Sequence, residues 1–185
     1  MPTVGTAELT LQERGILASS ASAAYLDHFS SADRVLVSAF QQPVQVLRKR
    51  TYYSRGQAYT IQWQDYGQPL PAWFDPLMQG FVDLLTLAPN WDSYHAGTID
   101  QKLIGDAMNF IHNILTPTSP APRVVALSSG GLQLEWHRNG VDLEVVFDRG
   151  EQPFFYCRNR VTGEESEHPL PANQVLLISI IANLE

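Results

Sequence analysis

Residues 132–147 read LQLEWHRNGVDLEVVF, two strand-like runs joined by Asn139-Gly140. Because Asn and Gly both tolerate a positive φ, this pair favours a two-residue type I′ turn, and that turn fixes how the two runs pair. In the resulting register Trp136 faces Leu143, and the large apolar side chains all lie on one side. The stretch therefore predicts an antiparallel hairpin with one buried face.

The same register predicts an acidic opposite face. It forms two cross-strand pairs, His137 with Asp142 and Glu135 with Glu144. Two carboxylates at directly opposed positions have Cβ atoms about 5 Å apart and repel each other. Solvent exposure would relieve the repulsion, and so would a cation, an arginine from elsewhere in the fold or a basic partner surface. On a covered face, the two carboxylates should share a proton or hold a positive group.

Turn-like residues separate this hairpin from its neighbours in the chain. Gly130-Gly131 precedes it and residues 148–151 follow it. They predict a β-meander with further strands at 124–127, 154–158 and 161–168, the last at an edge. The nearly continuous apolar positions of residues 169–184 predict a terminal helix that is deeply buried.

Two amphipathic helices are expected before the meander. Apolar residues at helical spacing predict a first helix over residues 72–87 that stops before Pro89. Thr98 is the expected N-cap of the second helix, which Pro117 ends. Its predicted apolar stripe consists of Ile99, Leu103, Ala107, Phe110, Ile111, Ile114 and Leu115.

The N-terminal part of the chain differs in texture. Residues 1–31 are rich in Ala, Ser and Thr and predict a mobile arm or a loosely docked helix. Residues 32–70 have β-branched and aromatic residues at strand-like spacing, with Arg55-Gly56 as a turn. Residues 71–185 then contain the helix-loop-helix, the meander and the C-terminal helix. The whole predicts an α+β fold, an antiparallel β-meander packed against helices, with a small N-terminal antiparallel β unit.

Composition and charge narrow the function classes. The 185 residues are 44% hydrophobic and carry a net charge of −7, a globular composition. Residues 71–185 hold 14 acidic and 6 basic side chains, so they disfavour nucleic acid and suit a basic protein partner. The single cysteine, Cys157, favours a reducing cytoplasm, and the most apolar stretch is too short for a membrane span. We expect no cofactor.

Residues 89–97 read PNWDSYHAG, a composition that predicts an ordered connection rather than a helix or strand. In one interpretation Trp91 and Tyr94 are hydrophobic plugs over the ends of the helices, and neighbouring Asn or Asp side chains tie the turn. In the other, Asp92 and His95 form a polar pair that faces a ligand or partner. A metal site is also chemically possible, from Asp92, His95, Glu135, His137 and Glu144.

Residues 48–63 suggest a further surface. The basic run Arg48-Lys49-Arg50 is interleaved with Tyr52, Tyr53, Tyr59 and Trp63, as in stacking surfaces for nucleic acid. A strand, however, places Arg48 and Arg50 on one face and Lys49 on the other, so the run is not a single patch.

The loop and the hairpin together resemble a widespread family of small bacterial proteins with no established activity. The matching residues are Asn90-Trp91-Asp92-x-Tyr94-x-Ala96, a helix, a linker with proline, Gly130-Gly131-x-x-Leu134-Glu135-Trp136 and Leu143-Glu144-Val145. The resemblance covers residues 72–150. Members typically read Asn-Trp-Asp-Gly-Tyr-Gly-Ala, so Ser93 and His95 stand where the family has glycine, the residue that favours positive φ. The resemblance implies the architecture and the importance of the loop and Glu135, but no reaction.

Residues 1–70 hold 6 basic and 5 acidic side chains, so the negative charge lies in residues 71–185. This charge asymmetry and the absence of a recognisable catalytic motif favour a protein-interaction role. We expect an accessory or regulatory subunit that binds a basic partner through Trp91, Asp92, Tyr94, His95, Glu135, His137, Asp142 and Glu144. The alternative is a metal-dependent or acid-base hydrolase that uses Asp92, His95, Glu135 and Glu144. Nucleic-acid binding through residues 48–63 ranks third.

Overall fold

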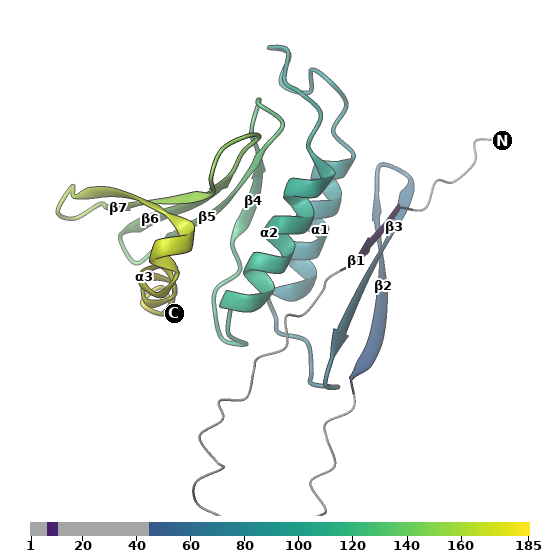
Figure 1. Cartoon of the computed structure of the whole chain (residues 1–185), viewed down its shortest axis with the longest axis horizontal. Coiled ribbons are helices and arrows are strands. Elements are labelled where there is room, and N and C mark those ends of the chain that lie inside the picture. The colour runs from purple at the N-terminus through teal and green to yellow at the C-terminus, as the bar shows by residue number, and fades with distance from the viewer. Residues whose placement is uncertain (1–6, 11–44) are drawn as a thin grey trace, which may run out of the picture.

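The computed structural model describes residues 7–10 and 45–185 of the chain. Within these residues lie two sheets, with helices α1 and α2 between them (Figure 1). The smaller sheet has the order β1-β3-β2, formed by β1 (Ala7–Thr10), β2 (Val46–Ser54) and β3 (Gln57–Asp65). The larger sheet runs β4 (Arg123–Ala126), β5 (Leu132–Arg138), β6 (Val141–Phe147), β7 (Phe154–Asn159) and β8 (Glu165–Pro169). The helices are α1 (Phe74–Leu85), α2 (Gln101–Ile114) and α3 (Leu170–Ala182). The predicted α+β class is confirmed.

The central hairpin of the larger sheet has the predicted register. Strands β5 and β6 pair antiparallel and set Glu135 opposite Glu144. Asn139 and Gly140 have φ values of 51° and 77°, as the type I′ turn requires. The inner face of the hairpin is buried, formed by Leu132, Leu134, Trp136, Leu143, Val145 and Phe147.

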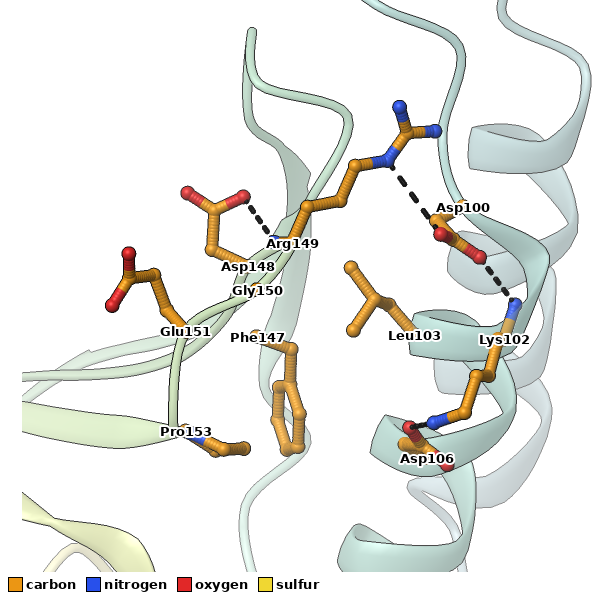
Figure 2. Close-up of a pocket in the computed structure, with 10 residues that line it drawn as sticks. All are labelled: Asp100, Lys102, Leu103, Asp106, Phe147, Asp148, Arg149, Gly150, Glu151 and Pro153. Carbon is orange, nitrogen blue, oxygen red and sulfur yellow. Dashed lines mark hydrogen bonds and ion pairs between the residues drawn. The ribbon is translucent and has the colours of Figure 1, made fainter.

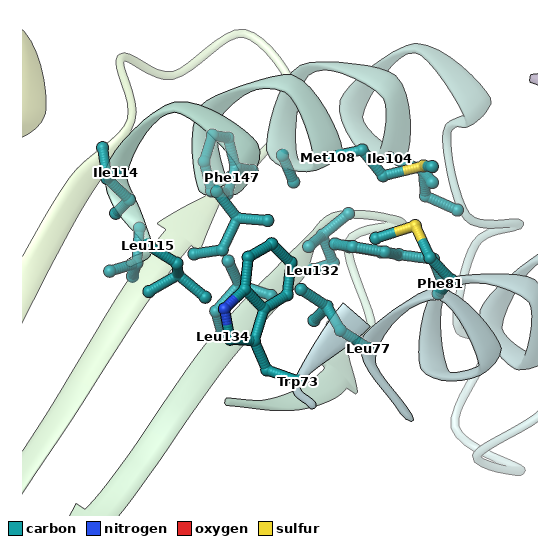
Figure 3. Packing of buried hydrophobic residues seen from close by; sticks show 14 of the residues in the cluster. Trp73, Leu77, Phe81, Ile104, Met108, Ile114, Leu115, Leu132, Leu134 and Phe147 are labelled. Carbon is teal, nitrogen blue, oxygen red and sulfur yellow. The ribbon is translucent and has the colours of Figure 1, made fainter. Parts of the chain in front are cut away.

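Helices α1 and α2 cover this inner face. Figure 3 shows Phe81 of α1 and Met108 of α2 in one cluster with Leu134 of β5. The proline-rich connection from α2 to β4 closes the cluster, because it accepts hydrogen bonds from two buried indoles. Trp136 Nε1 donates to the Pro120 carbonyl at 2.9 Å, and Trp73 Nε1 donates to the Thr116 carbonyl at 2.7 Å. The larger sheet and the two helices therefore share one core.

The smaller sheet packs on the other side of α1. Strands β2 and β3 form the predicted hairpin, with Arg55 and Gly56 at positive φ. Inward-facing Tyr52 and Trp63 join the same buried cluster as α1. Residues 1–31 were expected to be a mobile arm or a loosely docked helix, but residues 7–10 form strand β1, which pairs parallel with the edge of β3. The other residues of that range, and residues 32–44 of the predicted β unit, lie outside the described residues.

Helix α2 starts later than the sequence predicts. Asp100, not Thr98, is its N-cap, and Asp100 Oδ1 accepts a hydrogen bond from the Lys102 amide at 2.9 Å. The reason is that residues 97–100 are held against the β4–β5 turn, by Gly97 N to the Ser128 carbonyl and by Asp100 N to the Gly130 carbonyl. Figure 2 shows Asp100 between Lys102 and the Arg149 side chain of the β6–β7 turn.

Helix α3 is not deeply buried, so that expectation is wrong. Leu170, Leu177 and Ile181 face the core beside β7 and β8, whereas Val175 is 81% exposed, Leu176 40% and Ile178 38%. The sequence cannot show which apolar residues of α3 are buried, because they lie on several sides of the helix. The described chain buries mainly the side with Leu170, Leu177 and Ile181. None of the helices in the described residues is long and apolar enough to cross a membrane.

Candidate functional site

Alternate residues of the larger sheet point away from α1 and α2, and we call that side the outer face. Strand register arranges its polar residues in two neighbouring rows. The first row, from β4 to β8, is Arg123, Glu135, Glu144, Tyr156 and Glu167. The second row, from β5 to β8, is His137, Asp142, Arg158 and Glu165. Carboxylates thus occupy most strands of this face.

Glu135 is held by neighbours on its own strand. Its side chain accepts a short hydrogen bond from the Gln133 amide, and its Oε2 lies 3.5 Å from His137 Nε2. Gln133 and His137 flank Glu135 two residues away on either side, so they share its face. These contacts orient Glu135 along β5. The repulsion with Glu144 is therefore eased by a local amide and imidazole, a solution that the sequence register did not reveal.

His137 lies between two carboxylates. Its Nδ1 is 2.7 Å from Asp142 Oδ1, an oxygen that is also 3.4 Å from Arg160 Nε. The hydrogen bond to Asp142, with a further contribution from Glu135, raises the pKa of His137 above its ordinary value. The arrangement favours an imidazolium held in place over a neutral imidazole acting as a base.

The middle of the first row carries negative charge that is not paired. Glu144 and Glu167 are the register neighbours of Tyr156 on either side. Arg158 in the second row forms an ion pair with Glu165, with 3.4 Å between Arg158 Nε and Glu165 Oε1. In the part of the chain that the structure describes, Glu144 and Glu167 form no ion pair. Neighbouring strands are about 4.8 Å apart, so the backbone positions of Glu144 and Glu167 are about 10 Å apart, with Tyr156 between them.

Sequence reasoning missed Tyr156 and Glu167. A two-residue turn fixes the β5–β6 pairing, but longer turns join β6 to β7 and β7 to β8, and their composition does not set a register. Alternation within residues 154–158 could have placed Tyr156 and Arg158 on one side. It could not have told which residues of β6 they face.

The loop of residues 89–97 lies at the ends of α1 and α2, beside the β4–β5 turn (Figure 1). Its backbone is tied by two side chains. Asp92 Oδ1 accepts from the amides of Tyr94 and Ala96, at 2.7 and 3.1 Å, and Asn90 Oδ1 accepts from the His95 amide at 2.6 Å. The prediction that Asn or Asp side chains tie this turn is confirmed.

The aromatic residues of the loop have different surroundings. Trp91 is half-buried, and its buried Nε1 has no hydrogen-bond partner among the described residues. Tyr94 is 85% exposed, so it is not the hydrophobic plug that one interpretation expected. The hydrogen bond from the Tyr94 amide to Asp92 Oδ1 holds the backbone of Tyr94, while the Tyr94 ring faces solvent.

The structure divides the predicted site residues into two groups. Trp91, Asp92, Tyr94 and His95 lie in the loop, whereas Glu135, His137, Asp142 and Glu144 lie on the outer face. The hydrogen bonds that hold the loop run within it and to the β4–β5 turn. Among residues 7–10 and 45–185, no three His, Cys, Asp or Glu side chains are grouped as a metal site would need. The four residues of the hydrolase alternative therefore lie in two separate groups, Asp92 and His95 in the loop and Glu135 and Glu144 on the outer face.

The basic and aromatic residues of β2 and β3 do not form an open stacking surface. Tyr52, Tyr59 and Trp63 are buried in the core. Arg48 Nε lies 3.1 Å from Asp65 Oδ1, and Arg50 contacts Asp75 at the start of α1. Arg48 thus pairs within the hairpin and Arg50 joins it to α1, while Lys49 and Tyr53 lie on the opposite face.

The cleft between α2 and the β6–β7 turn, of about 530 Å³, is also lined by charged residues (Figure 2). Both of its basic side chains are paired with carboxylates. Arg149 Nε lies 3.5 Å from Asp100 Oδ2, and Lys102 Nζ lies 2.5 Å from Asp106. The first contact joins the start of α2 to the β6–β7 turn, and the second lies within α2.

No protein-family model, curated protein or solved structure matches this chain. The resemblance of its loop and hairpin to a family of small bacterial proteins therefore remains a prediction.

Proposed function

We propose that this protein is an interaction module, an accessory or regulatory subunit that binds a basic partner protein through its outer face. The observation that carries the proposal is the segment Glu144–Tyr156–Glu167 of the first row, in which an aromatic ring lies between two carboxylates that form no ion pair with any residue the structure describes. In the described part of the chain, no element covers this face.

The chemistry of the segment suits an arginine of the partner. A guanidinium can stack on the Tyr156 ring while its nitrogens donate to carboxylates on both sides. The lysine ammonium is a strongly hydrated point charge and gains less from the ring. Arg158 in the second row is paired with Glu165, and therefore not with Glu144 or Glu167. Glu165 also contacts the Tyr156 hydroxyl, which leaves the ring of Tyr156 as the stacking surface. Exposed Tyr94 gives a separate contact point at the helix ends for a partner that reaches the loop.

Titration of a labelled octa-arginine peptide into the purified protein tests the proposal. The double variant Glu144→Gln with Glu167→Gln should weaken binding about tenfold, equivalent to ~1.4 kcal/mol for the loss of two charge contacts, one half-buried and one exposed. Added salt should weaken binding to the wild type, and should have a smaller effect on the double variant.

A matched control separates this site from the general acidity of the chain. Glu151→Gln with Glu164→Gln removes the same net charge from two exposed turn positions. This control should bind the peptide as the wild type does. Equal weakening by the two double variants would mean that the peptide responds only to net charge, and the proposal would be abandoned.

A further inference from the structure

Helix α3 has a second apolar stripe on the side that faces away from the core. Val175 and Ile178 lie one turn apart on that side, with Leu176 beside them, and all three are exposed. Ala182, also exposed, extends the same stripe towards the C-terminal end of the helix, whereas Pro171 lies before a kink at Asn173. Val161 is 85% exposed as well, but it is a single residue in the β7–β8 turn.

A helix that is apolar on every side is typical of one buried on every side. Removing the exposed stripe from water would be favourable, because the stabilisation grows with the apolar area that is buried. The described chain covers α3 chiefly from β7 and β8, through Leu177 and Ile181. From the composition of α3 we therefore expect a second surface to cover its exposed apolar stripe.

Charge indicates what this surface is. The chain carries a net charge of −7, yet no residue from Leu170 to Leu184 is charged. A basic partner would find no carboxylate on this stripe, and helices that bind membrane surfaces carry Lys or Arg beside their apolar face. Two copies of this acidic chain, by contrast, can approach here without placing like charges in contact. Residues 11–44, the remaining alternative, lie outside the described residues, but the strands that they join, β1 and β2, belong to the smaller sheet on the far side of α1 and α2 from α3 (Figure 1).

We propose that α3 is a homodimer interface, in which the Val175 and Ile178 stripes of two copies pack against each other about a two-fold axis. This arrangement is isologous, the commonest form of protein dimer. It does not depend on the proposed function. Since α3 packs on the core side of the larger sheet with Phe155, the outer face remains open in the dimer.

Mass measurement across protein concentration tests the proposal. One helix from each copy makes a small interface, so we expect the wild type to pass from monomer to dimer between roughly 1 and 100 µM. Val175→Glu and Val175→Lys should each remain monomeric over this range, because two-fold symmetry would bring like charges together. Both should fold, since the side chain is 81% exposed. An equimolar mixture of the two variants should regain the dimer through opposite charges.

The matched control is Val161→Glu, which changes an equally exposed valine away from α3 and should leave the dimer intact. A wild type that stays monomeric up to 100 µM would overturn the proposal and point to cover from residues 11–44. Single variants that still dimerise would overturn it too, and a mixture that stays monomeric would rule out packing of α3 on α3.

Discussion

At the scale of the residue, the loop of residues 89–97 departs furthest from ordinary backbone geometry. Ser93 and His95 have φ values of 65° and 70°, in the left-handed region that costs a side chain-bearing residue about 1–2 kcal/mol. These are the two positions at which the resembling family has glycine. The hydrogen bonds that Asp92 and Asn90 accept from the Tyr94 and His95 amides hold the conformation without glycine.

Substitution of Ser93 should therefore change stability in an unusual order. Ser93→Gly should raise the free energy of unfolding by about 0.5–1 kcal/mol, because relief at positive φ exceeds the entropy that glycine adds to the unfolded chain. Ser93→Val should lower it by about 1–2 kcal/mol, because a β-branched residue tolerates positive φ least. Urea unfolding measures both. Ser166, an exposed serine in β8, is the control and should give the reverse order, with Gly the worse of the two.

His137 provides a residue-scale prediction about pH. Its pKa is raised in the folded protein, chiefly by the hydrogen bond to Asp142. The stabilisation from this contact is therefore complete below the unfolded pKa of about 6.5 and is lost as the pH rises through the higher folded pKa. Asp142→Asn should move the pKa of His137 back towards its ordinary value and flatten this part of the stability profile. NMR titration of the imidazole measures the shift, and an unchanged pKa in the variant would contradict the assigned cause.

At the scale of the element, the start of α2 shows where sequence signals compete. Thr98 and Asp100 are both good N-cap residues. The structure selects Asp100 because the amide of Gly97 and the carbonyl of Thr98 are used in contacts with Ser128 and Arg149. Tertiary hydrogen bonds thus place the helix boundary.

Substitution at the two candidate caps distinguishes them. Asp100→Ala should lower the free energy of unfolding by about 1 kcal/mol, whereas Thr98→Ala should change it by less than about 0.5 kcal/mol. Asp100→Asn keeps the cap acceptor and loses the ion pair with Arg149, so it should retain most of the stability. Thermal unfolding measures all three variants. A larger loss in Thr98→Ala than in Asp100→Ala would restore the cap predicted from the sequence.

The elements also show why one part of the candidate site was predictable. Asn139-Gly140 permits one tight turn, so local sequence alone is enough to place Glu135 opposite Glu144. The turns that follow allow several registers, so Tyr156 and Glu167 could not be added to the row. Alternation along β5 places Gln133 and His137 on the same face as Glu135. Whether they contact it depends on side-chain rotamers, which the sequence does not give.

At the scale of the whole molecule, the class of fold and the order of its main elements followed from periodicity and turn composition. Packing between distant elements did not. No local sequence pattern predicts that the loop of residues 89–97 lies beside the β4–β5 turn rather than on the outer face, or that Tyr52 and Trp63 face α1. The apolar pattern of α3 predicts burial correctly as a tendency, but it cannot say whether the same chain or another provides the cover.

The central claim is that the outer face of the larger sheet binds a basic partner. Amide NMR shifts of the labelled protein during titration with the octa-arginine peptide test it most directly. We predict saturable shifts centred on Glu144, Tyr156 and Glu167, with little change in the 89–97 loop or in α3. Shifts centred on either of those regions, with the first row unchanged, would contradict the claim.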